Sequence, residues 1–132
     1  YRQPCNRFVA GFVGESNLID AEIVRREGAS LVLRTKTGHI FRSPAPEEVS
    51  GRNVTVLVRP ERLILSDTPG QESIPARVKS ALFLGEILRI EATLDSGETL
   101  LVRCSDSAGQ TLPAPGSMVH VSWGMSDGWV LA

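Results

Sequence analysis

The feature that most constrains the fold is a succession of short segments with strand-like apolar patterning, separated by turn-forming residues. The separators include Glu27-Gly28, Thr37-Gly38, Asp95-Ser96-Gly97 and Ser126-Asp127-Gly128, which are typical of tight turns between antiparallel strands. Many short strands at this spacing favour an all-β barrel or sandwich over an alternation of strands and helices. The predicted strands are residues 18–25, 29–35, 39–43, 54–58, 63–65, 74–84, 87–94, 99–103, 118–123 and 129–131.

A weak internal repeat divides the chain into two similar halves. In each half a turn (Lys36-Thr37-Gly38, then Asp95-Ser96-Gly97) precedes a glycine-led strand, and an apolar triplet follows at residues 63–65 and 129–131. Residues 66–73, between the halves, are polar and rich in turn formers, as in a linker. Each half holds about five strands, the size of a small open barrel, so the sequence predicts two such units in tandem.

The predicted domains are a helical segment over residues 1–17 and a β domain over residues 18–132, with units at about 18–66 and 74–132. Because the chain starts with Tyr1 and not with Met, we expect it to be a fragment of a longer protein.

The predicted helical segment is residues 4–14. Pro4 suits the first position of a helix, and Gly14 can end one. The apolar residues that recur on one face are Phe8, Val9, Phe12 and Val13.

Charge and composition exclude several classes of protein. The net charge is −1 and only 5% of residues are aromatic, so the chain lacks both the basic surface and the stacking platforms of a nucleic-acid-binding barrel. No apolar run is long enough to span a membrane. Cys5 and Cys104 alone do not make a disulfide framework, which favours a reduced intracellular protein.

The sequence offers no catalytic or metal-binding arrangement. It has no Gly-Lys-Ser/Thr step, hence no phosphate-binding P-loop. His39 and His120 have no ligand partner two or four residues away, so we expect no metal site. The adjacent Glu47 and Glu48 lie in a proline-rich stretch, where paired carboxylates are usually solvated.

A rigid corner at Arg59-Pro60-Glu61 interrupts a strand-like run from residue 54 to residue 65. Pro60 cannot donate to a sheet and favours an extended conformation at the preceding residue, so the strand must turn or end there. The corner has two readings that the sequence leaves open. It is either a barrel-closing bend with a surface ion pair, or a corner that faces an interface or a ligand.

A second candidate follows at Phe83-Leu84-Gly85-Glu86, where an apolar strand meets a glycine. This pattern indicates either a bulge or tight bend, or an exposed apolar edge that docks a second subunit. The interface candidates are therefore Arg59, Pro60, Glu61, Phe83, Leu84, Gly85 and Glu86.

Three segments carry a resemblance to a known family: residues 6–17, Val58-Arg59-Pro60-Glu61 and Phe83-Leu84-Gly85-Glu86. In order and content they resemble the C-terminal region of the ATP-binding subunits of bacterial ABC importers. The resemblance is to the subgroup that carries a TOBE (transport-associated OB) domain, as in polyamine, ferric-iron and sugar importers.

The resemblance implies that the chain is all-β, with tandem OB-like TOBE barrel units after a short connector helix over residues 1–17. It also implies a C-terminal regulatory and dimerisation domain. In such subunits the ATPase motifs lie upstream and have no counterpart here, so ATP and Mg belong to the parent subunit and this chain has no cofactor and no catalytic residues of its own. We therefore expect no ATPase activity from the chain alone. In the parent subunit, the resemblance implies coupling of ATP hydrolysis to solute uptake.

The implied partners are a second copy of the same subunit, the transmembrane permease subunits through the absent ATPase domain, and a small-molecule or protein regulator, with no nucleic acid. The implied location is the cytoplasm, peripheral to the inner face of the plasma membrane. The alternative function is a small-ligand or oxyanion-sensing OB-like module. Related domains in molybdate systems bind an oxyanion, although their short motif set is not evident here.

Overall fold

The structure, a computed structural model, describes residues 16–49, 51–70, 72–105 and 113–131. The predicted connector helix, residues 4–14, lies outside the described residues. No helix among the described residues is long and apolar enough to cross a membrane.

The described residues form an all-β fold, as predicted, and each predicted strand overlaps an observed one. The two short helical elements are single 3₁₀ turns, η1 (Pro60–Arg62) and η2 (Met125–Asp127). The strands are β1 (Asn17–Glu27), β2 (Ser30–Arg34), β3 (Ile40–Pro44), β4 (Asn53–Val58), β5 (Ile64–Ser66), β6 (Ile74–Leu84), β7 (Ile87–Leu94), β8 (Thr99–Ser105), β9 (Met118–Ser122) and β10 (Gly128–Leu131).

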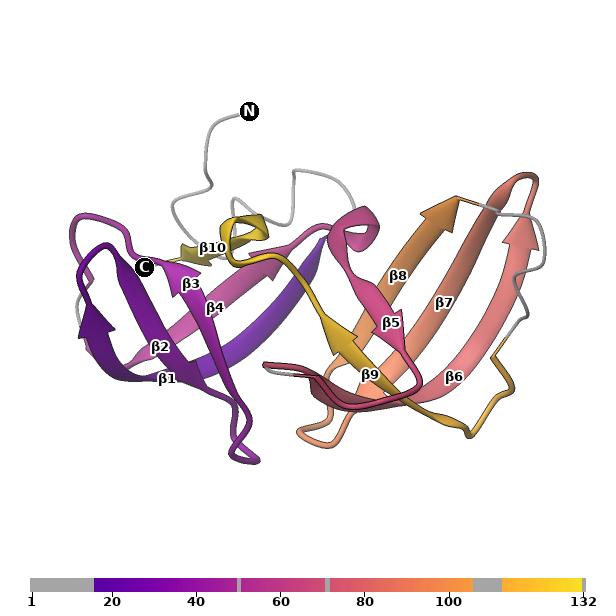
Figure 1. Ribbon diagram of the computed structural model, residues 1–132, viewed down its shortest axis with the longest axis horizontal. Coiled ribbons are helices and arrows are strands. Elements are labelled where there is room, and N and C mark those ends of the chain that lie inside the picture. The colour runs from indigo at the N-terminus through magenta and orange to yellow at the C-terminus, as the bar shows by residue number, and fades with distance from the viewer. Residues whose placement is uncertain (1–15, 50, 71, 106–112, 132) are drawn as a thin grey trace.

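The strands form two five-stranded antiparallel sheets that lie side by side (Figure 1). The first has the order β10-β4-β1-β2-β3 and the second has the order β5-β9-β6-β7-β8. The halves of the chain therefore exchange their last strands. β5 pairs with β9 in the second sheet, and β10 pairs with β4 in the first.

Both crossings between the sheets use a 3₁₀ turn. The chain leaves β4 through η1, where Pro60 occupies the first position after an extended Arg59. It returns to the first sheet through η2. The two crossings contact each other, because the Arg62 Nε and Asp127 Oδ1 atoms are 3.8 Å apart and the Arg59 guanidinium lies 5.7 Å from the centre of the Trp129 ring.

The main hydrophobic core of the described residues runs through both sheets. Alternate residues of the strands face it, such as Ile19 and Val56 in the first sheet and Ile90 and Val121 in the second, all buried. A contact between Phe41 of β3 and Trp123, which follows β9, joins the two sheets edge to face with ring centres 5.2 Å apart. We call the first sheet the first barrel and the second sheet the second barrel. The two barrels therefore share a core and pack against each other.

A buried asparagine completes the seam between the barrels. The Asn17 side chain is 3% exposed. Its Nδ2 donates to the Leu101 carbonyl at 2.8 Å, and its Oδ1 accepts from the Leu101 N–H at 2.7 Å. Because β8 is an edge strand, this amide occupies the place that a neighbouring strand would take. Nearby, the Asp20 N–H donates to Glu98 at 2.7 Å.

Candidate functional site

The structure places the Arg59-Pro60-Glu61 corner at the crossing from the first sheet to the second. Pro60 is buried and Arg59 is half-buried against Trp129, whereas Glu61 is exposed. Two of the three corner residues thus pack within the molecule.

The second candidate lies at the turn between β6 and β7, at the outer end of the second sheet and away from the crossing (Figure 1). Gly85 has a φ of +66°, in the left-handed region that glycine adopts without a steric penalty. The neighbouring apolar side chains are exposed, with 41% of Phe83 and 55% of Leu84 accessible to solvent. Leu82 and Ile87 are also exposed, so we call Leu82, Phe83, Leu84 and Ile87 the hairpin tip. The structure does not bring the tip and the corner together.

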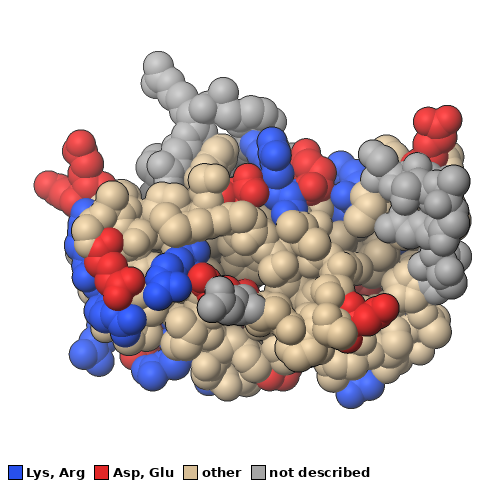
Figure 2. Space-filling model, viewed as in Figure 1, with Lys and Arg blue, Asp and Glu red and all other residues tan. Residues whose placement is uncertain are grey.

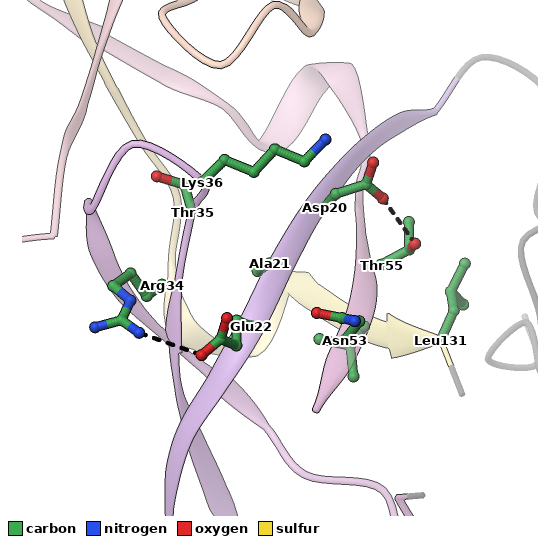
Figure 3. A pocket seen from close by; sticks show the side chains of 10 residues that line it. Asp20, Ala21, Glu22, Arg34, Thr35, Lys36, Asn53, Thr55 and Leu131 are labelled. Carbon is green, nitrogen blue, oxygen red and sulfur yellow. Dashed lines mark hydrogen bonds and ion pairs between the residues drawn. The ribbon is translucent and has the colours of Figure 1, made fainter. Parts of the chain in front are cut away.

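A cavity of about 720 Å³ opens on the first barrel, and its lining is mostly polar (Figure 3). Its volume falls within the range of sites that hold small molecules. Strand β1 contributes two acids, the last residue of β2 and the turn after it contribute one base each, and β4 contributes hydroxyl and amide groups. The lining residues are Asp20, Ala21, Glu22, Arg34, Thr35, Lys36, Asn53, Val54, Thr55 and Leu131.

Strand register places polar and charged lining residues directly opposite one another on neighbouring strands. Glu22 is opposite Arg34 on β2 and opposite Asn53 on β4. The Arg34 guanidinium donates to Glu22 at 3.2 Å, and the Thr55 hydroxyl donates to Asp20 at 3.0 Å. Lys36 makes no ion pair with any residue that the structure describes. In Figure 3 its side chain extends toward β1.

The cavity borders the seam between the barrels. The turn that follows Lys36 contacts the β7–β8 turn of the second barrel, because Thr37 and His39 bond to the Asp95 carboxylate at 2.7 and 2.8 Å. Partial burial acts to raise the pKa of Asp95, but the bonds to Thr37 and His39 outweigh it and hold that pKa below its usual value. Strand β1, through its bond to Glu98, and the turn after Lys36 thus both contact the second barrel.

Sequence reasoning did not identify this cavity. Asp20 and Glu22 alternate on one strand, which is a signal for a shared face. However, the bases and amides that complete the cavity come from strands whose register only the fold defines. Among the residues that the structure describes, no group of three or more His, Cys, Asp or Glu side chains gathers as a metal site would require.

Charges of both signs are interspersed on the face of the molecule drawn in Figure 2, most densely over the first barrel. The mixture matches the cavity, where acids and bases occupy adjacent strands. The surface potential on this face is therefore mixed in sign.

Comparison with known proteins assigns the family. The family model described as "TOBE domain" matches residues 56–131, more than half of the chain. The chain belongs to the TOBE domain family. The match begins in β4 and includes both crossings between the sheets and the hairpin tip.

The similar curated proteins are ATP-binding subunits of importers. The chain is 38% identical over 104 residues to the spermidine/putrescine import ATP-binding protein PotA 1 of Pseudomonas aeruginosa, covering 78% of the chain and 28% of that protein. It is 32% identical over 124 residues to the PotA protein of Ruegeria pomeroyi, covering 93% and 33%. It is also 32% identical over 126 residues to YdcT of Escherichia coli, described as an uncharacterized ABC transporter ATP-binding protein, covering 93% and 31%. The chain spans about a third of the length of these relatives.

A solved structure has the same architecture. The cytoplasmic molybdate-binding protein ModG, with molybdate bound, superposes with a TM-score of 0.70 at 13% identity, covering 88% of this chain and 95% of that one. Likeness at this identity concerns the fold alone, and it supports the predicted OB-like architecture. The family model and the curated relatives place this TOBE domain with those of importer ATP-binding subunits, which confirms the family resemblance of the sequence.

Proposed function

We propose that the chain is the C-terminal regulatory and dimerisation domain of an importer ATP-binding subunit, which in full length couples ATP hydrolysis to solute uptake. The proposed setting is the cytoplasmic face of the membrane, where the subunit meets a second copy of itself and, through its ATPase domain, the permease. The solutes named for the relatives, spermidine and putrescine, make a polyamine the first solute to test.

The observation that carries this proposal is the hairpin tip. Exposed apolar clusters of this kind are characteristic of interaction sites. The tip lies at the outer end of the second sheet, so a pair of tips related by a twofold axis can present the same surface to each other. A barrel pair held in this way can keep two subunits together while their ATPase domains open and close. A regulator shifts that equilibrium only by its different affinity for the two states.

Sedimentation analysis of the purified chain at increasing concentration tests the dimer. We expect reversible dimers, and we expect the paired substitution Phe83→Ser and Leu84→Ser to weaken the dimerisation constant by roughly tenfold or more, since buried apolar anchors dominate interface energies. Ile64→Ser is the matched control, because Ile64 is 58% exposed on β5 in another part of the molecule. A chain that stays monomeric, or a dimer that the paired substitution leaves intact, contradicts the proposal.

The second candidate function is a small-ligand-binding module, and the cavity on the first barrel favours it. ModG, which has the same fold, is described as a molybdate-binding protein, which makes an oxyanion one ligand to test. Titration of the chain with molybdate, followed by amide NMR, tests this candidate for anions. Saturable shifts at the cavity residues support it.

A further inference from the structure

We propose that the cavity on the first barrel binds a small zwitterion, a molecule with one carboxylate and one ammonium group. The inference rests on the second candidate function, since it requires the cavity to be a ligand site. It names the chemical class of the ligand from the charges that line the cavity.

Among the described lining residues, acids and bases are equal in number and lie on different segments of the chain. Two carboxylates, Asp20 and Glu22, lie on β1, and two cationic side chains, Arg34 and Lys36, lie on and after β2. Adjacent strands are about 5 Å apart, so the acidic and basic strips face the same ligand volume. A dication would place an ammonium group beside the bases, and a dianion would place a carboxylate beside the acids. A zwitterion avoids both repulsions.

Lys36 and Asn53 supply binding groups, because their side chains have no partner among the described residues. Lys36 makes no ion pair with a described residue, so its ammonium is available to a ligand carboxylate. The Asn53 amide, on the far side of β1, makes no side-chain hydrogen bond to a described residue and can donate or accept. Strand β1 lies between β2 and β4 in the sheet, and its two acids, which accept from Thr55 and Arg34, add the negative charge that complements a ligand ammonium.

The remaining lining limits the size and character of the ligand. Leu131 provides a small apolar wall, and none of the described lining side chains is aromatic. A flat ring therefore has no stacking partner. A short aliphatic chain with polar ends fits the lining better.

A ligand bound in the cavity can affect the second barrel, because segments that line the cavity hydrogen-bond to it. The Asp20 N–H bonds to Glu98, and the turn after Lys36 bonds to Asp95 through Thr37 and His39. Asp95 and Glu98 flank the same β7–β8 turn. A ligand that reorients Lys36 or shifts β1 therefore changes contacts that the second barrel makes.

Three probes with the same number of chain carbons separate the ligand classes: γ-aminobutyrate as the zwitterion, putrescine as the dication and succinate as the dianion. Each is titrated into the full chain, and amide NMR shifts are followed at Lys36, Asn53 and residues 95–98. We expect saturable shifts with γ-aminobutyrate at these positions, at an affinity roughly tenfold or more above that of the other two probes.

Matched variants locate the site. We expect Lys36→Gln to weaken γ-aminobutyrate binding by roughly tenfold, because it removes the cationic anchor while keeping the length and polarity of the side chain. Its unfolding midpoint should not change, since Lys36 has no described partner. Glu22→Gln, on the acidic strip, is a second test and should also weaken binding. Lys79→Gln, on the exposed part of β6, is the control and should leave binding unchanged.

The outcomes separate this inference from the candidate function beneath it. Stronger binding of putrescine or succinate at the cavity residues overturns the zwitterion assignment and leaves the ligand-binding function standing. The absence of saturable shifts with all three probes and with molybdate overturns both. Equal loss of binding in Lys36→Gln and Lys79→Gln shows non-specific binding and also overturns the assignment.

Discussion

At the scale of single residues, one side chain joins the two barrels at the seam. The Asn17 amide presents a donor and an acceptor to the free edge of β8, as a peptide group of a neighbouring strand would. Asn17 lies in the first segment on which the family resemblance rests. Its position in the fold provides a physical reason for an amide there, because neither a carboxylate nor an aliphatic side chain offers both groups.

We expect Asn17→Asp to lower the free energy of unfolding by about 2–4 kcal/mol at neutral pH. The aspartate keeps the size of the side chain, but it loses the donor to the Leu101 carbonyl and places a buried negative charge beside that oxygen. Urea unfolding measures the change. Asn53→Ala is the control, because Asn53 is exposed, and it should change stability by less than about 0.5 kcal/mol. Equal effects of the two substitutions would refute this role of the Asn17 amide.

At the scale of elements, the exchange of β5 and β10 decides how each barrel closes. β10 pairs with β4 at one edge of the first sheet. The Ser43 hydroxyl of β3, the other edge strand, donates to the Gly128 carbonyl of β10 at 3.2 Å, so the two edges of the sheet contact each other. Gly128 is buried at this closure. A Cβ there would come within 3.2 Å of the Trp123 ring nitrogen and 3.3 Å of a Val56 methyl.

We expect Gly128→Val to lower the free energy of unfolding by about 1–3 kcal/mol, because the added methyl groups overpack the closure. Thermal and urea unfolding measure it. Gly70→Val is the matched control, since nothing lies within 4 Å of a Cβ at Gly70. A Gly128 variant as stable as the Gly70 variant would mean that the closure tolerates extra volume.

The strands themselves were predictable, and their partners were not. Alternation and turn residues located every strand, including the short runs at residues 63–65 and 129–131. The same alternation states which face of a strand is buried but not which neighbour it pairs with. The units expected from the sequence, residues 18–66 and 74–132, place β5 in the first unit and β10 in the second. In the structure β5 belongs to the second sheet and β10 to the first.

At the scale of the whole molecule, the continuous core implies that the two barrels unfold together. Buried residues of both sheets belong to one cluster, and two strands cross between the sheets. Neither sheet keeps all its strands if the other half of the chain unfolds.

We expect a single unfolding transition in urea, with tryptophan fluorescence and far-ultraviolet circular dichroism giving the same midpoint. Ile90→Ala in the second sheet should lower the free energy of unfolding by about 2–5 kcal/mol, because it leaves a cavity in the shared core. Amide hydrogen exchange should show the loss of protection in β1 and β4 of the first sheet as well. Loss confined to the second sheet, or two separate transitions, would indicate independent barrels.

The sequence by itself determined the all-β class, the position of each strand, the family and the absence of a recognisable catalytic motif. These properties depend on local patterns and on short motifs. Only the tertiary structure decided the strand exchange and the hydrogen bonds of the Asn17 amide to β8. It also decided the packing of Arg59 and Pro60 at a crossing and the cavity that brings Asp20, Lys36 and Asn53 together. The physical reason is that each of these features depends on the register and pairing of strands distant in the chain. Side-chain alternation, which repeats every two residues, is compatible with many such pairings.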